Sequence, residues 1–282
     1  MNASIGRPPT EDRPFQHYTL GHRFRAWVSQ HLFDQVTYTV RHGLLTGMRR
    51  RGGLGWIPQV LVGGAESKEV GFFRRLDLSG LVVYDVGAFQ GLMTLHFARR
   101  AGSVVCFEPN TRNRARLVEN LTLNGLTNVT VRSCGLGSRE RKHTMAFLPL
   151  MPGGGSLDEE TVAHLKLNSA TALEEIEVTT LDLERRREHL PPPDFIKIDI
   201  EGYELEALHG ARETLVGSHP ALYLEMHGET IAEKRRKVVA IVEHLVDLGY
   251  RTIEHVESGA PINSANSSQA MEGHLYCRWG DR

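Results

Sequence analysis

Two segments of the chain carry charged side chains where buried β-strands are expected. Across residues 195–200 the side chains alternate, which places Lys197 and Asp199 on one face of the strand. Downstream, Glu225 and His227 share a face of another expected strand. Central strands of a parallel sheet are normally apolar, and an unpaired buried charge is costly, so we expect Lys197 to pair with Asp199 or Glu225. Charges that converge on strand ends mark a reaction centre more often than a purely structural ion pair, which is the alternative.

The residue types in this group suit proton transfer. His227 has the side chain that titrates nearest to neutral pH, so it is the first candidate for a general base. Asp199 is the rival candidate, either as the base or as the acceptor that orients a substrate hydroxyl. Asp199 and Glu201 could instead hold a divalent cation that acidifies that hydroxyl. Because the sequence shows only two close carboxylates, we expect a site without a metal ion.

A second group of residues forms a glycine turn, Asp85-Val86-Gly87-Ala88-Phe89-Gln90-Gly91, between an expected strand and an expected helix. Gly87 allows a tight turn and a close approach of ligand to backbone, and Gly91 lets the helix begin close to the sheet. Asp85 would repel a diphosphate but suits a cationic ligand. S-adenosylmethionine carries an ammonium and a sulfonium group where dinucleotides carry a pyrophosphate, so the turn favours S-adenosylmethionine. On its own, the motif could also be a plain strand–helix turn.

Glu108 ends the next expected strand, 17 residues after Gly91. An acid at this place can accept hydrogen bonds from both ribose hydroxyls of an adenosine ligand. Asn110 follows and starts the next helix. Taken alone, Glu108 could be an exposed acid at a strand end, but its spacing from the glycine turn favours the ribose role.

Alternating strands and helices are expected to position these residues. The expected strands are 81–86, 103–108, 128–134, 195–200 and 221–226, and the expected helices are 92–101, 112–123, 203–216 and 231–248. Two further strands, 250–256 and 274–279, leave no room for a helix between them and should form an antiparallel hairpin. We predict a Rossmann-like class I methyltransferase fold: a mostly parallel seven-stranded sheet with a terminal antiparallel hairpin and helices on both faces.

The remaining segments are expected to flank this domain. Residues 1–55 are predicted to be an N-terminal extension, partly disordered and then helical, with one or two helices within 22–48. Residues 56–282 form the methyltransferase domain, with a lid-like insertion at about 136–180. The insertion contains a glycine-rich stretch, 152–156, and a strand-like run, 176–181. It lacks the Gly-Lys-Ser/Thr ending of a phosphate-binding loop, and an ordinary surface loop is the alternative to a lid.

The composition of the chain argues against some classes of binding partner. The chain has 282 residues, and its 33 basic residues nearly balance its 34 acidic ones, which gives no support for nucleic-acid or membrane-surface binding. The run 49–51, three arginines, is expected to be a solvated face. Three widely spaced cysteines indicate reduced thiols. With no leader and no apolar run near the ~20 residues of a membrane span, the expected location is the cytoplasm. The oligomeric state stays open.

Six segments, in order, resemble FkbM-family methyltransferases. They are Asp85–Gly91, Cys106–Asn110, Thr179–Asp182, Phe195–Gly202, Glu204–Ala211 and Leu222–His227. The similarity covers about residues 80–230, and the Lys-Ile-Asp-Ile-Glu-Gly block is its most specific part. The resemblance implies transfer of the methyl group of S-adenosylmethionine, usually to a hydroxyl oxygen of a sugar or specialised metabolite. Residues 1–60 and the closing segment have no counterpart in it.

The resemblance also implies roles for individual residues. Glu108 would bind the ribose, the backbone around Cys134 and Gly135 would border the adenine, and Asp199, Glu201 and His227 would lie near the transferred methyl. The full set of candidate cofactor-binding residues is Asp85, Gly87, Ala88, Phe89, Gly91, Glu108, Asn110, Cys134, Gly135 and Asp199. The candidate catalytic residues are Lys197, Asp199, Glu201 and His227.

Two other classes of protein compete with this interpretation. A nicotinamide-dependent oxidoreductase would share the fold but should show three glycines in its turn, whereas here Asp85 holds the first position and Phe89 stands in the middle. A non-catalytic protein that binds an adenosyl ligand or serves as a scaffold could keep the fold without the chemistry. The intact set of Lys197, Asp199 and His227 argues against that class.

Overall fold

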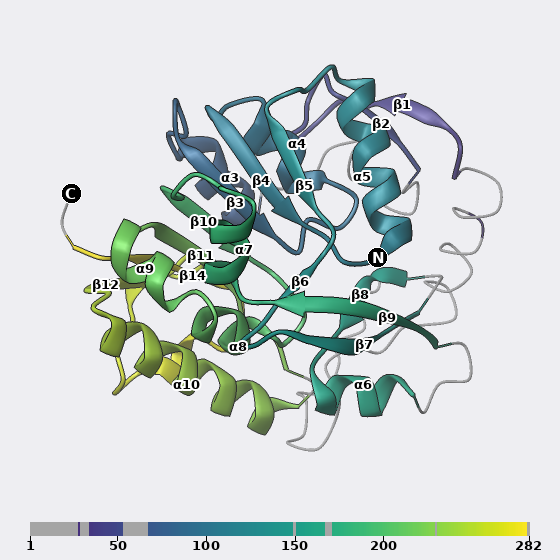
Figure 1. Cartoon of the computed structure of the whole chain (residues 1–282). Coiled ribbons are helices and arrows are strands. Elements are labelled where there is room, and N and C mark those ends of the chain that lie inside the picture. The colour runs from purple at the N-terminus through teal and green to yellow at the C-terminus, as the bar shows by residue number, and fades with distance from the viewer. Residues whose placement is uncertain are drawn as a thin grey trace, which may run out of the picture.

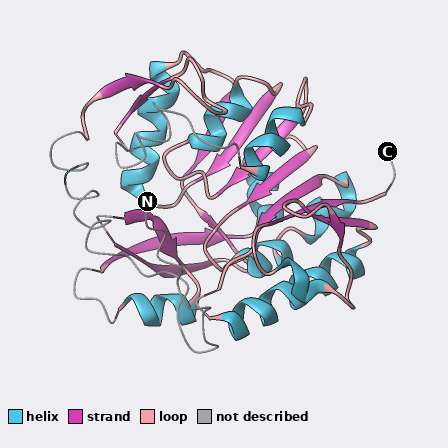
Figure 2. Cartoon of the chain, turned by 180° about the vertical axis from the view of Figure 1, so that it is seen from behind, coloured by secondary structure: helices cyan, strands magenta, loops and turns pink. Residues whose placement is uncertain are grey.

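The computed structural model describes residue 28 and residues 34–52, 67–148, 151–166, 171–228 and 230–280. Its centre is an eight-stranded sheet between two layers of helices (Figure 1, Figure 2). From one edge to the other, the strands are β13 (Ala260–Pro261), β12 (Thr252–His255), β14 (His274–Arg278), β11 (Ala221–Glu225), β10 (Phe195–Ile198), β3 (Val82–Val86), β4 (Ser103–Phe107) and β5 (Val129–Arg132). The strands from β11 to β5 run parallel to their neighbours.

Successive residues of the central strands face opposite helical layers. Val83 and Phe195 pack in one core with α3 (Lys68–Arg75) and α4 (Leu92–Ala98), beside which lies α5 (Thr111–Leu123). Tyr84 and Ile196 pack in the other core. The helices of that layer are α7 (Leu181–Arg187), α8 (Glu204–His209), α9 (Arg212–Ser218) and α10 (Ile231–Leu248). Because both faces are covered, each central strand is apolar on both sides except at its carboxyl end.

The predicted fold class is confirmed. β14 lies antiparallel to both β11 and β12, as the short connection required, and the two-residue strand β13 adds an eighth member at the edge. One predicted helix, 203–216, is divided into α8 and α9. The break lies at Gly210, where a Cβ would come within 2.0 Å of the Gly137 carbonyl oxygen. The carbonyl of Gly210 accepts a hydrogen bond from the Asp182 backbone, so tertiary contacts replace helical bonds there.

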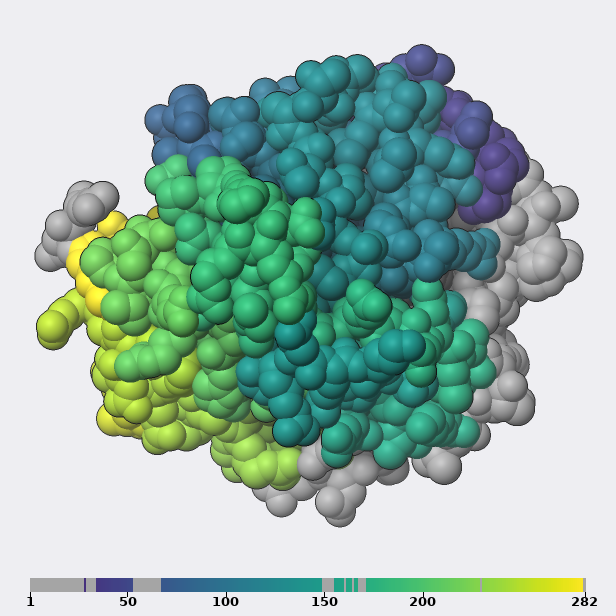
Figure 3. Space-filling model, in the orientation of Figure 1, coloured from purple at the N-terminus to yellow at the C-terminus, as the bar shows by residue number. Residues whose placement is uncertain are grey.

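The segment expected as a lid-like insertion forms a second sheet. In spatial order its strands are β6 (Gly135–Leu136), β9 (Ala172–Thr179), β7 (Arg141–Leu148) and β8 (Met151–Ser156), with α6 (Glu159–Leu165) beside them. The glycine-rich stretch is therefore part of a strand. The expected strand 176–181 ends at Thr179, because Thr180 caps α7 by accepting a hydrogen bond from the Leu183 backbone. Ile200 and Tyr203 share a core with the insertion, which packs against the domain (Figure 3).

Residues 34–52 form a hairpin where helix was predicted. Its strands β1 (Thr37–Thr39) and β2 (Arg49–Arg51) pair antiparallel. Gly43 and Gly47 have φ of +85° and +86°, which favours a turn over a helix. The arginine run is not wholly solvated, because Arg50 lies in β2 with 4% of its surface exposed. Apart from residue 28, residues 1–33 and 53–55 lie outside the described residues, so the disorder and helices expected there stay predictions. The domain boundary between residues 55 and 56 also stays a prediction.

The cysteines and the helices agree with the expectations from composition. Cys106, Cys134 and Cys277 are buried and form no disulfide. Among the residues that the structure describes, no helix combines the length and apolarity needed to cross a lipid bilayer.

Candidate active site

A cleft opens at the carboxyl ends of β3, β4 and β10, where ligands bind in sheets of this kind. The space within it, open solvent included, is about 580 Å³. Seven of the predicted site residues line it beside other groups. The lining residues are Val86, Gly87, Phe89, Phe107, Glu108, Pro109, Asn113, Cys134, Gly135, Leu136, Met145, Gly155, Leu157, Asp199, Ile200 and Glu201.

The glycine turn is held between the two neighbouring strands. Gly87 and Ala88 donate backbone hydrogen bonds to the Phe107 carbonyl oxygen at 3.1 and 3.0 Å. Gly87 has φ of +85°, and a Cβ there would lie 1.8 Å from the Asp199 carbonyl oxygen. No larger residue fits this position, so β3 and β10 meet in the turn through bare backbone. Phe89 also has positive φ, at +50°, and lines the cleft.

Glu108 is held by backbone at the floor of the cleft. Its Oε2 accepts a hydrogen bond from the Phe89 N–H at 2.7 Å, and its Oε1 accepts one from the Asn110 N–H at 2.9 Å. The side chain is 5% exposed, and burial raises its pKa to about 8 against these two hydrogen bonds. A carboxylate can accept about four hydrogen bonds, so Glu108 keeps acceptor capacity for a ligand even with Asn113 beside it. Asn110 does not line the cleft; it caps α5 and donates to Glu174 at 2.6 Å.

Asp85 does not reach the cleft, contrary to the role we expected for it. Its side chain has no exposed surface, and its Oδ2 accepts a hydrogen bond from the Thr94 hydroxyl at 2.5 Å. The Lys197 Nζ lies 4.0 Å from its Oδ1, because the two residues are partners in the β3–β10 register. Burial raises the pKa of Asp85. The residue holds the strand ends together from within the sheet.

Gly91 and Ala88 also lie outside the cleft lining. Gly91 begins α4, but the group closest to its missing Cβ is Leu117 of α5, at 2.5 Å. The glycine therefore permits close packing against α5, whereas we expected it to bring the helix close to the sheet.

Lys197 and Asp199 form the expected pair. The Lys197 Nζ lies 2.8 Å from Asp199 Oδ2, and Lys197 is buried below the cleft. Burial opposes ionisation of Asp199, but the charges of Lys197 and His227 outweigh it and lower its pKa. Asp199 thus presents an ionised carboxylate to the cleft.

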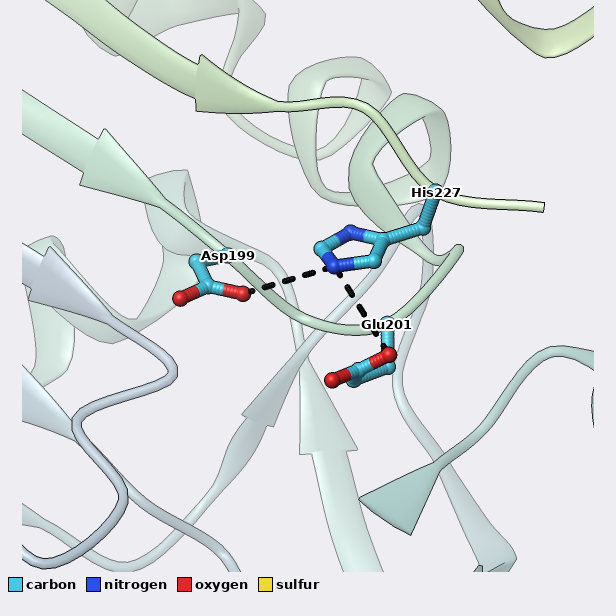
Figure 4. Close-up of side chains that lie close together, drawn as sticks. All are labelled: Asp199, Glu201 and His227. Carbon is cyan, nitrogen blue, oxygen red and sulfur yellow. Dashed lines mark ion pairs between the residues drawn. The ribbon is translucent and has the colours of Figure 1, made fainter. Parts of the chain in front are cut away.

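His227 lies beside the Asp199 end of the cleft, and its ring is surrounded by carboxylates. Its Nδ1 lies 2.8 Å from Glu204 Oε1. Its Nε2 faces Asp199 Oδ1 at 3.8 Å and Glu201 Oε2 at 3.6 Å (Figure 4). Glu225 Oε1 also lies 3.6 Å from Nε2. Burial alone would lower the pKa of His227, but Glu201, Glu204 and Asp199 raise it to about 10. Burial in turn raises the pKa of Glu201 to about 7.

Several groups at this site were not found from the sequence. Glu204 was placed only in a helix, yet it is fully buried and accepts backbone hydrogen bonds from Gly202 at 3.0 Å and Ile200 at 3.3 Å. Met145 and Leu157 reach the cleft from the insertion. Nothing in the sequence marks these two, because their contact with the cleft depends on how the second sheet packs.

Comparisons with known proteins place the chain among methyltransferases. The model of the methyltransferase FkbM domain matches residues 85–252 of the chain. Methyltransferase sdnD from Sordaria araneosa is 30% identical over 156 residues, which cover 46% of this chain and 60% of that protein.

Solved structures are similar at lower identity. Methyltransferase FkbM from Methylobacillus flagellatus has 20% identity and a TM-score of 0.49, over 78% of this chain and 50% of that one. The ribosomal protein L11 methylase from Lactobacillus delbrueckii has 13% identity and a TM-score of 0.43, over 76% of this chain and 77% of that one. The chain thus spans less than two thirds of the sdnD and Methylobacillus proteins.

Proposed function

The chain belongs to the FkbM methyltransferase family, and from this we propose that it transfers the methyl group of S-adenosylmethionine to a hydroxyl oxygen of a small acceptor. The acceptor class we propose is a sugar or specialised metabolite. Family membership identifies the methyltransferase domain. The proposals for the cofactor and the acceptor are based on the chemistry of the cleft.

The observation that carries the proposal is the position of Glu108. Two backbone N–H groups aim its carboxylate at the cleft, one of them from the glycine turn itself. In this orientation the two oxygens can accept hydrogen bonds from the two ribose hydroxyls of an adenosine ligand. Cys134 and Gly135 line the cleft and are the proposed border of the adenine.

The other end of the cleft is acidic and suits the cationic part of the cofactor. Asp199 and Glu201 line it with Glu204 and Glu225 beside them, and we propose that this acidic centre as a whole takes the electrostatic role we expected for Asp85. A sulfonium and an ammonium group would be attracted there, whereas the pyrophosphate of a dinucleotide would be repelled. This charge pattern separates S-adenosylmethionine from a nicotinamide cofactor.

Methyl transfer is an in-line displacement at a carbon that the sulfonium already activates. The protein must align the acceptor oxygen, the methyl carbon and the sulfur, and exclude water. We propose that Asp199 and Glu201 orient the acceptor hydroxyl by accepting its hydrogen bond. Met145 and Leu157 provide apolar cover, which supports our proposal that the insertion acts as a lid.

The role of His227 as a general base stays a prediction, and the geometry offers it little support. Its Nδ1 is bonded to Glu204, and its Nε2 faces three carboxylates. His227 is therefore better placed to organise the acidic centre than to act alone.

Calorimetric titration with S-adenosylmethionine, S-adenosylhomocysteine and NAD tests the cofactor. We expect binding of the first two and none of NAD, and a preference for NAD would overturn the proposal. Transfer of labelled methyl to a panel of hydroxylated sugars and metabolites, and to extracts of the source organism, then tests the reaction. Cofactor binding without labelling of any acceptor would favour the non-catalytic scaffold instead.

A further inference from the structure

Asp199, Glu201 and His227 bring three donor atoms together at the ends of β10 and β11. One oxygen of each carboxylate and one ring nitrogen all lie within 4.8 Å of one another. The three side chains converge on one point beside the cofactor cleft (Figure 4). We propose that they bind a divalent cation that coordinates and acidifies the acceptor hydroxyl, an inference that rests on the proposed methyl transfer.

The distances within this group suit a bridging cation better than direct hydrogen bonds. The His227 Nε2 lies 3.8 Å from Asp199 Oδ1 and 3.6 Å from Glu201 Oε2, beyond the ~3.2 Å limit of a normal hydrogen bond. Ligands bound at about 2.0–2.2 Å to one small cation lie roughly 3.0–3.6 Å apart. The two distances from Nε2 are close to this spacing, and all three donor atoms lie within 4.8 Å of one another.

A buried carboxylate orients the histidine for this purpose. The Glu204 Oε1 lies 2.8 Å from His227 Nδ1, and Glu204 is itself fixed by two backbone N–H groups. With Nδ1 held, Nε2 points at Asp199 and Glu201, and a cation bound there would replace the proton on Nε2. Histidines that bind metals characteristically have their other ring nitrogen held by a carboxylate or carbonyl. Glu204 lies outside the donor set, so its position is an observation independent of the three donors.

The donor types indicate which ions fit. Two carboxylates and one imidazole, with no thiolate among them, suit Mn²⁺, Mg²⁺ or Zn²⁺. From the sequence we expected no metal, because only two close carboxylates were evident. The fold adds the His227 nitrogen and the Glu225 carboxylate, which lies 3.6 Å from Nε2, and so removes that objection.

The cation would assist transfer without being consumed. The ion would lower the pKa of the coordinated acceptor hydroxyl, whose proton would pass to solvent. The acceptor oxygen then forms a bond to the methyl carbon. The carbon–sulfur bond breaks, and its electron pair remains on sulfur as the neutral thioether of S-adenosylhomocysteine.

Mn²⁺ titration of the full chain, followed by electron paramagnetic resonance, tests the site. We expect one tightly bound Mn²⁺ per chain, with a spin-echo modulation from a directly bonded ¹⁴N. The modulation should disappear in His227→Gln, and Mn²⁺ affinity should fall at least tenfold in Asp199→Asn. The matched controls are His209→Gln and Glu213→Gln, on α8 and α9 outside the cleft, which should bind Mn²⁺ like the wild type.

The wild-type spectrum decides the question even if a variant fails to fold. Absence of bound Mn²⁺, or a bound ion without a nitrogen ligand, would overturn the cation site. Full-rate methyl transfer by metal-free protein in excess chelator would also overturn it and would leave the methyltransferase proposal standing. Conversely, a normal Mn²⁺ spectrum with no S-adenosylmethionine binding would uphold the cation site and defeat the proposed function.

Discussion

Glu108 and Asp85 are both buried carboxyl groups near the ends of neighbouring strands, and their surroundings give them different tasks. Glu108 accepts two backbone hydrogen bonds and faces the cleft. Asp85 bonds to the Thr94 hydroxyl and lies near Lys197, inside the sheet. At the scale of the residue, the partners of a side chain therefore decide whether it can bind a ligand.

Replacing Glu108 tests its proposed contact with the ribose. Glu108→Ala should weaken binding of S-adenosylmethionine at least tenfold, about 1.4 kcal/mol, because two hydrogen bonds to the cofactor are lost. Calorimetry measures the change, and Glu213→Ala, an exposed acid on α9, is the control. Unchanged affinity in Glu108→Ala would remove the residue from the ribose role.

The titration of Glu108 should couple cofactor binding to pH. Its pKa is raised to about 8, and ribose hydroxyls donate to the ionised carboxylate, so binding should lower the pKa and release a proton. Affinity should rise as pH increases towards about 8 and then level off. Calorimetry in buffers of different ionisation enthalpy measures the proton, which should be absent in Glu108→Gln.

The raised pKa of Glu108 should also make the stability of the cofactor-free protein depend on pH. Between the unfolded pKa of 4.5 and the folded value of about 8, only the folded state keeps the proton on Glu108. The free energy of unfolding should therefore fall as pH rises through that window. Urea unfolding of the wild type and Glu108→Gln would show it, and identical pH profiles of the two proteins would contradict it.

At the scale of the element, the active site depends on how closely strand ends and turns approach. Glu201 has φ of +53° and Gly202 of +99°, so the loop after β10 is held in the left-handed region. The Ser156 hydroxyl of β8 donates to the Glu201 carbonyl at 2.6 Å. Lys237 of α10 lies 2.8 Å from Asp158 Oδ1, next to β8. The insertion and α10 together fix the loop that carries Glu201.

Gly87 offers the sharpest test of this close approach. Gly87→Ala should lower the free energy of unfolding by about 3–5 kcal/mol, because the strain of positive φ adds to the clash with the Asp199 carbonyl. Gly259→Ala is the control: its φ of +70° carries the strain, but no atom lies within 4 Å of the added Cβ. It should lose only about 1–2 kcal/mol. If the two variants lose the same free energy of unfolding in urea, the clash at Gly87 is relieved without cost, which would contradict this prediction.

At the scale of the whole molecule, one large core joins the helical layer to the insertion. It contains Leu208 of α8, Leu245 of α10 and Leu224 of β11, and it extends to Leu136 of β6 and Leu181 of α7. The second sheet reaches this core through Leu136, and its own cluster, with Met145 and Ile176, packs on Tyr203 of the domain. We therefore expect the two sheets to unfold together.

Leu208→Ala should therefore destabilise both sheets. The side chain is fully buried, and its truncation should cost about 2–5 kcal/mol, whereas Val246→Ala, on the exposed side of α10, should change stability by less than about 0.5 kcal/mol. Urea unfolding followed by circular dichroism gives these values. Hydrogen exchange in β7 and β9 should accelerate in Leu208→Ala as much as in β10, and acceleration in β10 alone would contradict a shared core.

The local pattern of the sequence was sufficient for the central sheet and part of the site. Strand periodicity placed β3, β4, β10, β11 and β14 within a few residues, because their alternation and their helical neighbours follow from which face is buried. The glycine turn and Glu108 could be found because both lie at the end of a strand in this pattern. The second sheet was missed, since its glycine-rich strand β8 shows no alternation.

Only the tertiary structure decided which charged residues meet. The sequence placed Lys197 and Asp199 on one face, but strand register and packing turned Asp85 into the sheet and brought Glu204 and Glu225 to His227. Periodicity records the face on which a side chain lies, not its neighbours across strands. For this reason the sequence alone indicated a methyl donor, a ribose acid and two carboxylates that could hold a cation, while the third donor, His227, joined them only at the assembled strand ends.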